Sequence, residues 1–107
     1  MKLTVLGFSP PYPNPNKATS AFLLETEVDR VLIDCGHGAA GKLLEKIDPS
    51  NLTAIIISHM HPDHFYDLIP LRNVFFKRKL KKIPLYMPPE GSEILNDVVK
   101  ATRLPSN

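Results

Sequence analysis

Short apolar segments alternate with polar turns along this chain, and their spacing predicts strands separated by helices. We expect strands at Lys2–Gly7, Ser20–Val28, Asp29–Asp34, Leu52–Ser58 and Ile83–Met87. The second and third should pair as an antiparallel hairpin, because a polar turn at Glu27–Arg30 joins them. Three consecutive isoleucines, Ile55 to Ile57, are typical of a central strand that is covered on both faces.

Three stretches repeat their apolar residues at helical spacing. We expect helices at Ala39–Ile47, at about Asp63–Lys79 and from a capping residue at Ser92 onward. The first should bury Leu43, Leu44 and Ile47 on one face. Pro70 is expected to kink or break the second, because proline lacks the backbone N–H that a helix interior needs. The resulting order of elements predicts an α/β fold with a mixed β-sheet.

The segment Ser9–Asn16 contains four prolines in eight residues, so it should form neither helix nor central strand. We interpret it as a stiff, extended loop between two strands. A proline-rich ligand for another domain is the alternative interpretation.

Metal-ligand side chains are concentrated at His59–His64, directly after the isoleucine run, where the sequence reads His-Met-His-Pro-Asp-His. In extended backbone, side chains two residues apart point the same way, so His59, His61 and Asp63 should face one side. Asp63 suits the N-cap of the following helix, which would turn His64 in a new direction. One ion could then take His59 and His61, and a second could take Asp63 and His64.

The chemistry of these side chains favours zinc, with iron or manganese as alternatives. A histidine-rich surface loop, or histidines that only cap a helix, is the competing interpretation. Four ligand-type side chains at this spacing, at the carboxyl end of a predicted buried strand, favour the metal site, because open α/β sheets bind their ligands there.

The His-x-His-x-Asp-His pattern after a hydrophobic strand resembles the signature of the metallo-β-lactamase-fold hydrolases. Three further stretches agree with it: the opening strand Lys2–Gly7, the strand pair Ser20–Glu25 and Arg30–Asp34, and the turn Asp34–Gly38. Together they are similar to the ribonuclease Z and phosphodiesterase branch of that superfamily. The resemblance implies a two-layered αβ/βα sandwich of two similar halves, with roughly twice this length or more. Residues 1–107 would then be the N-terminal half of such a domain.

The resemblance also implies an activity, the hydrolysis of phosphodiesters or related esters by a hydroxide that two metal ions activate. The metal ligands would be His59, His61, Asp63 and His64, and Asp63 would also act as the catalytic group that orients the water. Asp34 is expected to hydrogen-bond a ligating imidazole without binding metal, although an aspartate held by turn amides explains it nearly as well. The superfamily also hydrolyses β-lactams, lactones and thioesters, so the substrate stays open between small-molecule and nucleotide esters.

No histidine follows His64, so the ligands that the family supplies from its second half are missing from these 107 residues. We therefore expect this chain to be inactive by itself and to need a partner, either a C-terminal half or a second copy in a homodimer. A non-catalytic metal-binding half-domain, or a fragment that self-associates, is the alternative.

Composition limits the partners and the compartment. The formal net charge of +2 is too small to imply a nucleic acid, and the basic run Lys77–Lys82 is explained by the helix end that it closes. RNA is compatible with that run but is not indicated. A single cysteine, Cys35, excludes an internal disulfide and favours a buried thiol in a reducing compartment, so we expect a cytoplasmic protein. The opening run Met1–Leu6 is too short for a signal peptide or a membrane span.

Two further residues lie near the predicted metals. His37 follows a turn glycine, so it could contact a substrate, but it is not expected to be a ligand. Tyr66 could narrow the pocket, although packing is its simpler role.

Overall fold

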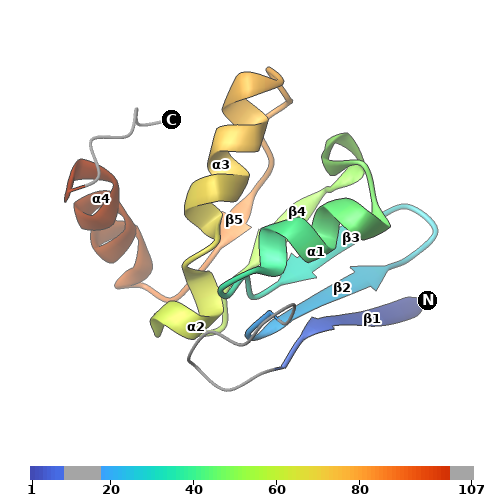
Figure 1. The fold of residues 1–107 in the computed structure, drawn as a ribbon, viewed down its shortest axis with the longest axis horizontal. Helices are drawn as coiled ribbons and strands as arrows, with labels where there is room; N and C mark the ends of the chain where they lie inside the picture. The colour runs from blue at the N-terminus through green and yellow to red at the C-terminus, as the bar shows by residue number, and fades with distance from the viewer. Residues whose placement is uncertain (9–17, 102–107) are drawn as a thin grey trace.

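The computed structural model describes residues 1–8 and 18–101, which form a five-stranded sheet with helices packed against it (Figure 1). The strands are β1 (Lys2–Gly7), β2 (Ala21–Glu25), β3 (Arg30–Ile33), β4 (Ala54–Ile56) and β5 (Leu85–Tyr86). The helices are α1 (Ala39–Lys46), α2 (Pro62–Phe65), α3 (Leu68–Lys77) and α4 (Gly91–Ala101), with one 3₁₀ turn at Pro49–Asn51. The predicted α/β class is therefore confirmed. The predicted proline-rich loop at Ser9–Asn16 lies outside the described residues.

The strand order is β1-β2-β3-β4-β5, and the sheet is mixed as predicted. The first three strands pair antiparallel. A tight turn joins β2 to β3, and in this turn Thr26 N–H donates to the Asp29 carbonyl at 2.8 Å. The pairs β3–β4 and β4–β5 are parallel, so their connections must cross over, and each crossover contains a helix. Figure 1 shows α1 and α3 on the same side of the sheet.

The hydrophobic core lies between the sheet and these helices. Leu23 of β2, Leu32 of β3 and Ile55 of β4 point toward them, and all three are buried with Leu43 and Leu71. Helix α1 contributes Ala39, Ala40 and Leu43 to the core. The prediction for Leu44 was wrong, because its side chain is exposed.

The prediction that β4 is covered on both faces was also wrong. Ile55 and Ile57 are buried, but Ile56 between them is 39% exposed. Successive side chains of a strand point to opposite faces, and the core-facing helices cover only the face that carries Ile55. The run of isoleucines therefore occupies a strand with one covered face and one open face.

The long helix predicted over Asp63–Lys79 is two helices, and the break lies at Tyr66–Asp67 rather than at Pro70. At the break, Asp67 N–H donates to the carbonyl of Cys35 at 2.9 Å, so a tertiary contact holds the chain out of a continuous helix. Pro70 lies in the first turn of α3, where the N–H groups lack intrahelical partners and proline is tolerated.

Two smaller differences concern the last part of the chain. Ser92 lies inside α4, which begins at Gly91, so it is not the cap that we predicted. Among the residues that the structure describes, no helix has the length and apolar character needed to cross a bilayer.

Candidate metal centre

The histidine-rich loop leaves the sheet at the carboxyl end of β4, beside the end of β3. The two strand ends are joined because Asp34 N–H donates to the Ile56 carbonyl at 2.7 Å. On the other side, Ile57 N–H donates to the Tyr86 carbonyl of β5 at 2.8 Å. Parallel strands thus bring Asp34 and the loop to one edge of the sheet, where such sheets place their ligands.

The loop passes directly into α2, and its N-cap is His61 rather than the predicted Asp63. His61 has extended backbone angles, Pro62 is the first helical residue, and Asp63 lies in the first turn. Proline suits the first helical position because its φ is already helical and its missing N–H would have no partner there. At the start of the helix, His64 N–H donates to the His61 carbonyl at 2.9 Å.

The four predicted ligands are neighbours in space. The ring centroids of His59 and His61 are 5.0 Å apart, and those of His59 and His64 are 3.7 Å apart. His64 Nε2 lies 3.2 Å from Asp63 Oδ2. His59 and His61 are exposed, whereas Asp63 and His64 are partly buried.

These contacts form pairs rather than a closed coordination shell. Within residues 1–8 and 18–101, no group of three or more histidine, cysteine, aspartate or glutamate side chains is arranged to hold one metal ion. Imidazole nitrogens and a carboxylate are nevertheless the donors that zinc takes, so the chemistry of the donor set fits. The side chains would have to reorient for three of them to meet one ion, and metal ligation stays a prediction.

Asp34 is the residue on which this arrangement depends. The residue is only 4% exposed, and its backbone has a φ of 61°, a left-handed conformation that aspartate tolerates better than most residues. One carboxylate oxygen, Oδ1, accepts from the Ser58 backbone N–H at 2.7 Å. The other, Oδ2, accepts from the Ser58 hydroxyl at 2.9 Å and from the Ser20 hydroxyl at 3.4 Å.

The same Oδ2 lies 2.9 Å from His64 Nδ1. A carboxylate can only accept, so Nδ1 carries a hydrogen in this contact. Nε2 lies 3.2 Å from Asp63 Oδ2 here, and in a neutral imidazole with its hydrogen on Nδ1 the Nε2 lone pair would be the one available to a metal. Asp34 therefore fixes the orientation of the His64 ring, and the amide that it binds belongs to Ser58 rather than to its own turn.

The turn after Asp34 packs directly against the histidine loop. Cys35 N–H donates to the His64 carbonyl at 2.7 Å, and Gly36 N–H donates to the Ser20 carbonyl at 3.0 Å. A Cβ at position 36 would overlap the Asp63 carbonyl oxygen and the Thr19 hydroxyl oxygen. Glycine is thus required at this position by close approach.

Asp67 joins the same turn to helix α1. Its Oδ2 accepts from the Ala40 backbone N–H at 2.9 Å, at the amino end of α1. Burial raises the pKa of the Asp67 carboxyl, and the hydrogen bond from Ala40 and the nearby His37 oppose this rise. The sequence interpretation gave Asp67 and Ser58 no supporting role, and it treated Gly36 only as a glycine of the turn after Asp34.

Cys35 is fully buried and free, as expected of a structural thiol. Burial, followed by the nearby carboxylates of Asp67 and Asp34, raises the pKa of the Cys35 thiol far above its ordinary range. The thiol is therefore protonated and unsuited to act as a nucleophile.

His37 and Tyr66 contact each other beside the turn. Their ring centroids are 4.8 Å apart at an angle of 34°. Tyr66 is 45% exposed, so packing accounts for only part of its ring. The backbone carbonyl of His37 accepts a hydrogen bond from Thr19 N–H at 2.9 Å and so helps to hold the segment before β2.

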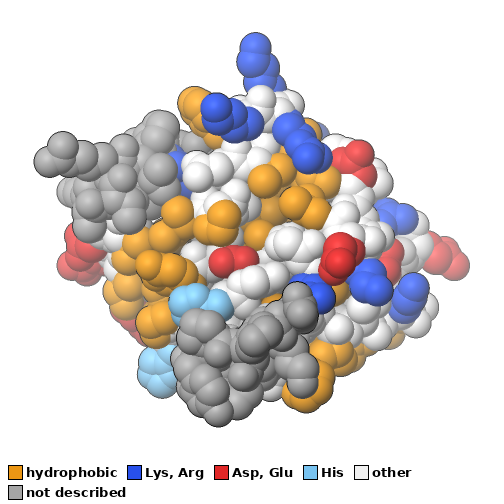
Figure 2. Space-filling model, in the orientation of Figure 1, with side chains coloured by type: hydrophobic (Ala, Val, Ile, Leu, Met, Phe, Trp, Pro, Cys, Tyr) orange, Lys and Arg blue, Asp and Glu red, His pale blue; other side chains and the backbone are white. Residues whose placement is uncertain are grey.

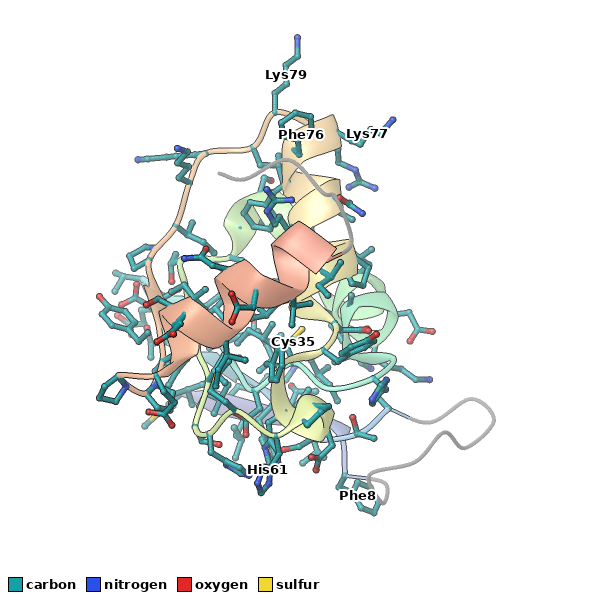
Figure 3. The ribbon with its side chains drawn as sticks, turned by 90° about the vertical axis from the view of Figure 1, so that its left-hand side faces the viewer. Phe8, Cys35, His61, Phe76, Lys77 and Lys79 are labelled. Carbon is teal, nitrogen blue, oxygen red and sulfur yellow. The ribbon has the colours of Figure 1, made fainter. Side chains whose placement is uncertain are left out.

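The basic run lies far from the histidine loop. Figure 3 shows Lys77 and Lys79 at one end of the molecule and His61 at the other, and the histidines and the upper group of blue side chains are separated in the same way in Figure 2. Lys77 is in the last turn of α3, where a cation interacts favourably with the helix dipole. The run therefore fits the helix-end interpretation better than contact with a substrate bound at the loop.

Comparisons with known proteins agree with this geometry. A family model described as the metallo-beta-lactamase superfamily matches residues 15–101. The probable metallo-hydrolase YhfI of Bacillus subtilis is 38% identical over 72 residues, which cover 67% of this chain and 30% of that protein. The human zinc phosphodiesterase ELAC protein 1 is 38% identical over 69 residues, covering 64% of this chain and 19% of that protein. The ribonuclease Z of Halorubrum lacusprofundi is 28% identical over 102 residues, which cover 94% of this chain and 33% of that protein.

Two solved structures share the fold described above. The metallo-beta-lactamase fold protein YhfI from Bacillus subtilis superposes with a TM-score of 0.82 at 30% identity, covering 89% of this chain and 39% of that chain. The short form of human tRNase Z also superposes with a TM-score of 0.82, at 28% identity, covering 98% of this chain and 42% of that chain. This chain thus spans less than half the length of each of these proteins.

Proposed function

This chain belongs to the metallo-beta-lactamase superfamily, and on that premise we propose that it provides the first part of a hydrolase metal site, as the N-terminal half of the family domain. In this proposal His59, His61, Asp63 and His64 bind zinc, with iron or manganese as alternatives. The observation that carries it is the 2.9 Å contact between Asp34 and His64 Nδ1, because a carboxylate behind an imidazole prepares the other ring nitrogen for a metal.

Bound metal ions would supply an activated hydroxide and a positive charge that stabilises the ester oxygens during the reaction. The chain's own residues would orient the reactants. Asp63 would hold the attacking water and accept its proton, and Asp34 would keep the His64 ring from rotating. Ser58 would in turn hold Asp34, because it donates to the carboxylate through both its backbone N–H and its hydroxyl.

Phosphodiesters are the substrate class that we favour. Support comes from the relatives, which include a zinc phosphodiesterase and a ribonuclease Z. The proposal covers small-molecule and nucleotide esters, and RNA remains compatible with it through those relatives. The described lysines do not add to that support, because Lys77 and Lys79 lie at the far end of the molecule from His61 (Figure 3).

We further propose that the 107 residues are inactive by themselves. A catalytic zinc usually takes three protein ligands and keeps an open position, whereas the described donors meet only in pairs. A non-catalytic metal-binding half-domain is the second candidate function, and the same paired donors favour it. A free, buried Cys35 is consistent with a reducing compartment, and we propose the cytoplasm.

Zinc binding by matched variants tests the proposal. His59→Ala and His61→Ala should each lower the zinc bound per chain in equilibrium dialysis, whereas His37→Ala, which removes a histidine outside the ligand set, should not. Cobalt should give a visible spectrum that both loop variants lose. Equal loss of zinc from all three variants would contradict the ligand assignment. Turnover of a phosphodiester by the purified 107-residue chain would contradict its inactivity.

A further inference from the structure

A cavity of about 560 Å³ lies between helices α3 and α4, on the face of the sheet that the helices cover. Its floor is formed by Ile55 and Leu85, which are register partners on β4 and β5. Leu71 of α3 and Leu95 of α4 line its sides. Successive strand residues point to opposite faces, so the cavity is separate from the exposed face that carries Ile56. Mostly apolar cavities of about 300–1,000 Å³ are the usual size of small-molecule sites.

The charged side chains that line this cavity are all cations. They are Arg72, Lys79 and Lys82, and no aspartate or glutamate lines the cavity within residues 18–101. A neutral apolar ligand would leave this positive charge unbalanced, whereas a carboxylate or a phosphate would pair with it.

Arg72 supplies the more specific evidence. Its Nη2 is buried, and within the part of the chain that the structure describes it has no hydrogen-bond partner. A guanidinium keeps its charge at every physiological pH, and a buried donor that lacks an acceptor costs free energy. Native proteins keep few such groups, and a ligand, an ion or a water usually completes them. We therefore expect a group with oxygen acceptors beside Arg72.

The turn after α3 forms one wall of the cavity. Leu80 N–H donates to the Phe75 carbonyl at 2.9 Å, and Lys79 N–H donates to the Phe76 carbonyl at 3.2 Å. These two bonds make a Schellman turn, which brings the residue after the turn against the last turn of the helix. Leu80 and Phe75 accordingly line the same cavity. The wall is thus fixed by backbone hydrogen bonds and stays clear of the interior.

We propose that this cavity binds an amphiphile with one hydrocarbon chain and an anionic head. The chain lies against the apolar walls, and the carboxylate or phosphate oxygens of the head accept from Arg72. Lys79 has a lesser part, because Figure 3 shows its side chain extended into solvent. The same view places Phe76 and Lys79, which line the cavity, at the opposite end of the molecule from His61. The inference therefore does not rest on the metal site and fails or stands separately from the proposed function.

Calorimetric titration of the metal-free chain with sodium laurate, below its micelle concentration, tests the site. We expect one laurate per chain with a Kd on the order of 100 µM or lower, the affinity of a single acyl chain for an apolar phase. Dodecanol has the same chain without the charge, so it should bind at least about tenfold more weakly. Dodecyl phosphate distinguishes the two sources of the anionic head, because the tighter-binding anion of the two identifies the head group.

Arg72→Met removes the charge and keeps an unbranched side chain. It should weaken laurate binding by about tenfold or more and leave dodecanol binding unchanged. The variant should fold, because it removes a buried donor that has no acceptor. Arg78→Met is the matched control for net charge, since Arg78 is exposed at the end of α3 and does not line the cavity. It should bind laurate as the wild type does.

Leu95→Trp should abolish the binding of both laurate and dodecanol, because the larger ring fills the cavity from α4. In the wild type, NMR methyl signals of Leu71 and Leu95 should shift with added laurate, which locates the ligand without any substitution. The proposal would be overturned by laurate that does not bind or that binds no tighter than dodecanol. It would equally be overturned by unchanged laurate affinity in Arg72→Met or Leu95→Trp, or by a longer natural product that binds no laurate because its own residues fill the cavity.

Discussion

Replacing Asp34 with asparagine should separate the shape of this side chain from its ability to accept hydrogen bonds on both ends. The wild-type carboxylate faces two donors at different oxygens, the Ser58 N–H at Oδ1 and His64 Nδ1 at Oδ2. Asparagine has one oxygen and one NH₂ group, so it can satisfy only one of these donors. The Ser58 N–H belongs to the backbone and cannot change, whereas the imidazole of His64 can move its hydrogen to Nε2.

We therefore expect Asp34→Asn to keep the fold and to place the hydrogen of His64 on the nitrogen that would bind metal. Loss of such a carboxylate partner typically lowers metal affinity by about 10- to 100-fold, which corresponds to about 1.4–2.7 kcal/mol. Competition with a chromophoric zinc chelator measures this change directly. Ser20→Ala is the control, because the Ser20 hydroxyl contacts Asp34 only at 3.4 Å and should alter zinc affinity little. Zinc affinity of Asp34→Asn within twofold of the wild type would refute the role of Asp34 in orienting His64.

The backbone at position 34 provides a second measurement on the same residue. Asp34→Gly and Asp34→Ala both remove the carboxylate, but alanine must also adopt the left-handed φ of 61°. The alanine variant should therefore be less stable than the glycine variant by about 1–2 kcal/mol in urea unfolding. Equal stability of the two variants would mean that the turn relaxes to another conformation.

The remaining predictions concern the residues that support the loop. Burial raises the pKa of Asp67 in the folded chain above its ordinary 3.8, so the protonated carboxyl stabilises the wild type fully below pH 3.8, and this stabilisation is lost as pH rises through the folded pKa. Asparagine does not titrate, so Asp67→Asn should gain stability relative to the wild type as pH rises. Urea unfolding of both proteins at pH 3 and pH 7 measures this, and a constant difference would contradict it. Gly36→Ala should lower the free energy of unfolding by more than about 2 kcal/mol, because its Cβ would overlap the Asp63 carbonyl; a change below about 0.5 kcal/mol would refute that close approach. Cys35 should react with a thiol reagent only as fast as the chain opens, because it is fully buried and protonated, and rapid labelling of the native chain would exclude this environment.

Local patterns were sufficient for much of this fold. Short apolar runs bounded by polar turns identified all five strands, and the spacing within His59–His64 predicted that the four candidate ligands would be neighbours before any tertiary contact was known. These features depend on residues that are close in sequence, and the pleat of a strand relates such residues in a fixed way. The predicted hairpin between β2 and β3 succeeded for the same reason, because its turn lies between the strands that it joins.

Contacts between distant residues decided the rest. Asp34 receives its shortest hydrogen bonds from Ser58 and His64, which are 24 and 30 positions away, and no local pattern indicates that pairing. The break between α2 and α3 depends on the Cys35 carbonyl, so the prediction that assigned the break to Pro70 relied on a local rule where a tertiary bond decides. Ile56 shows the same limit for burial. Its sequence context is as apolar as that of Ile55, yet it is exposed, because the layer packed against each face of a sheet depends on where distant helices dock and not on the strand itself.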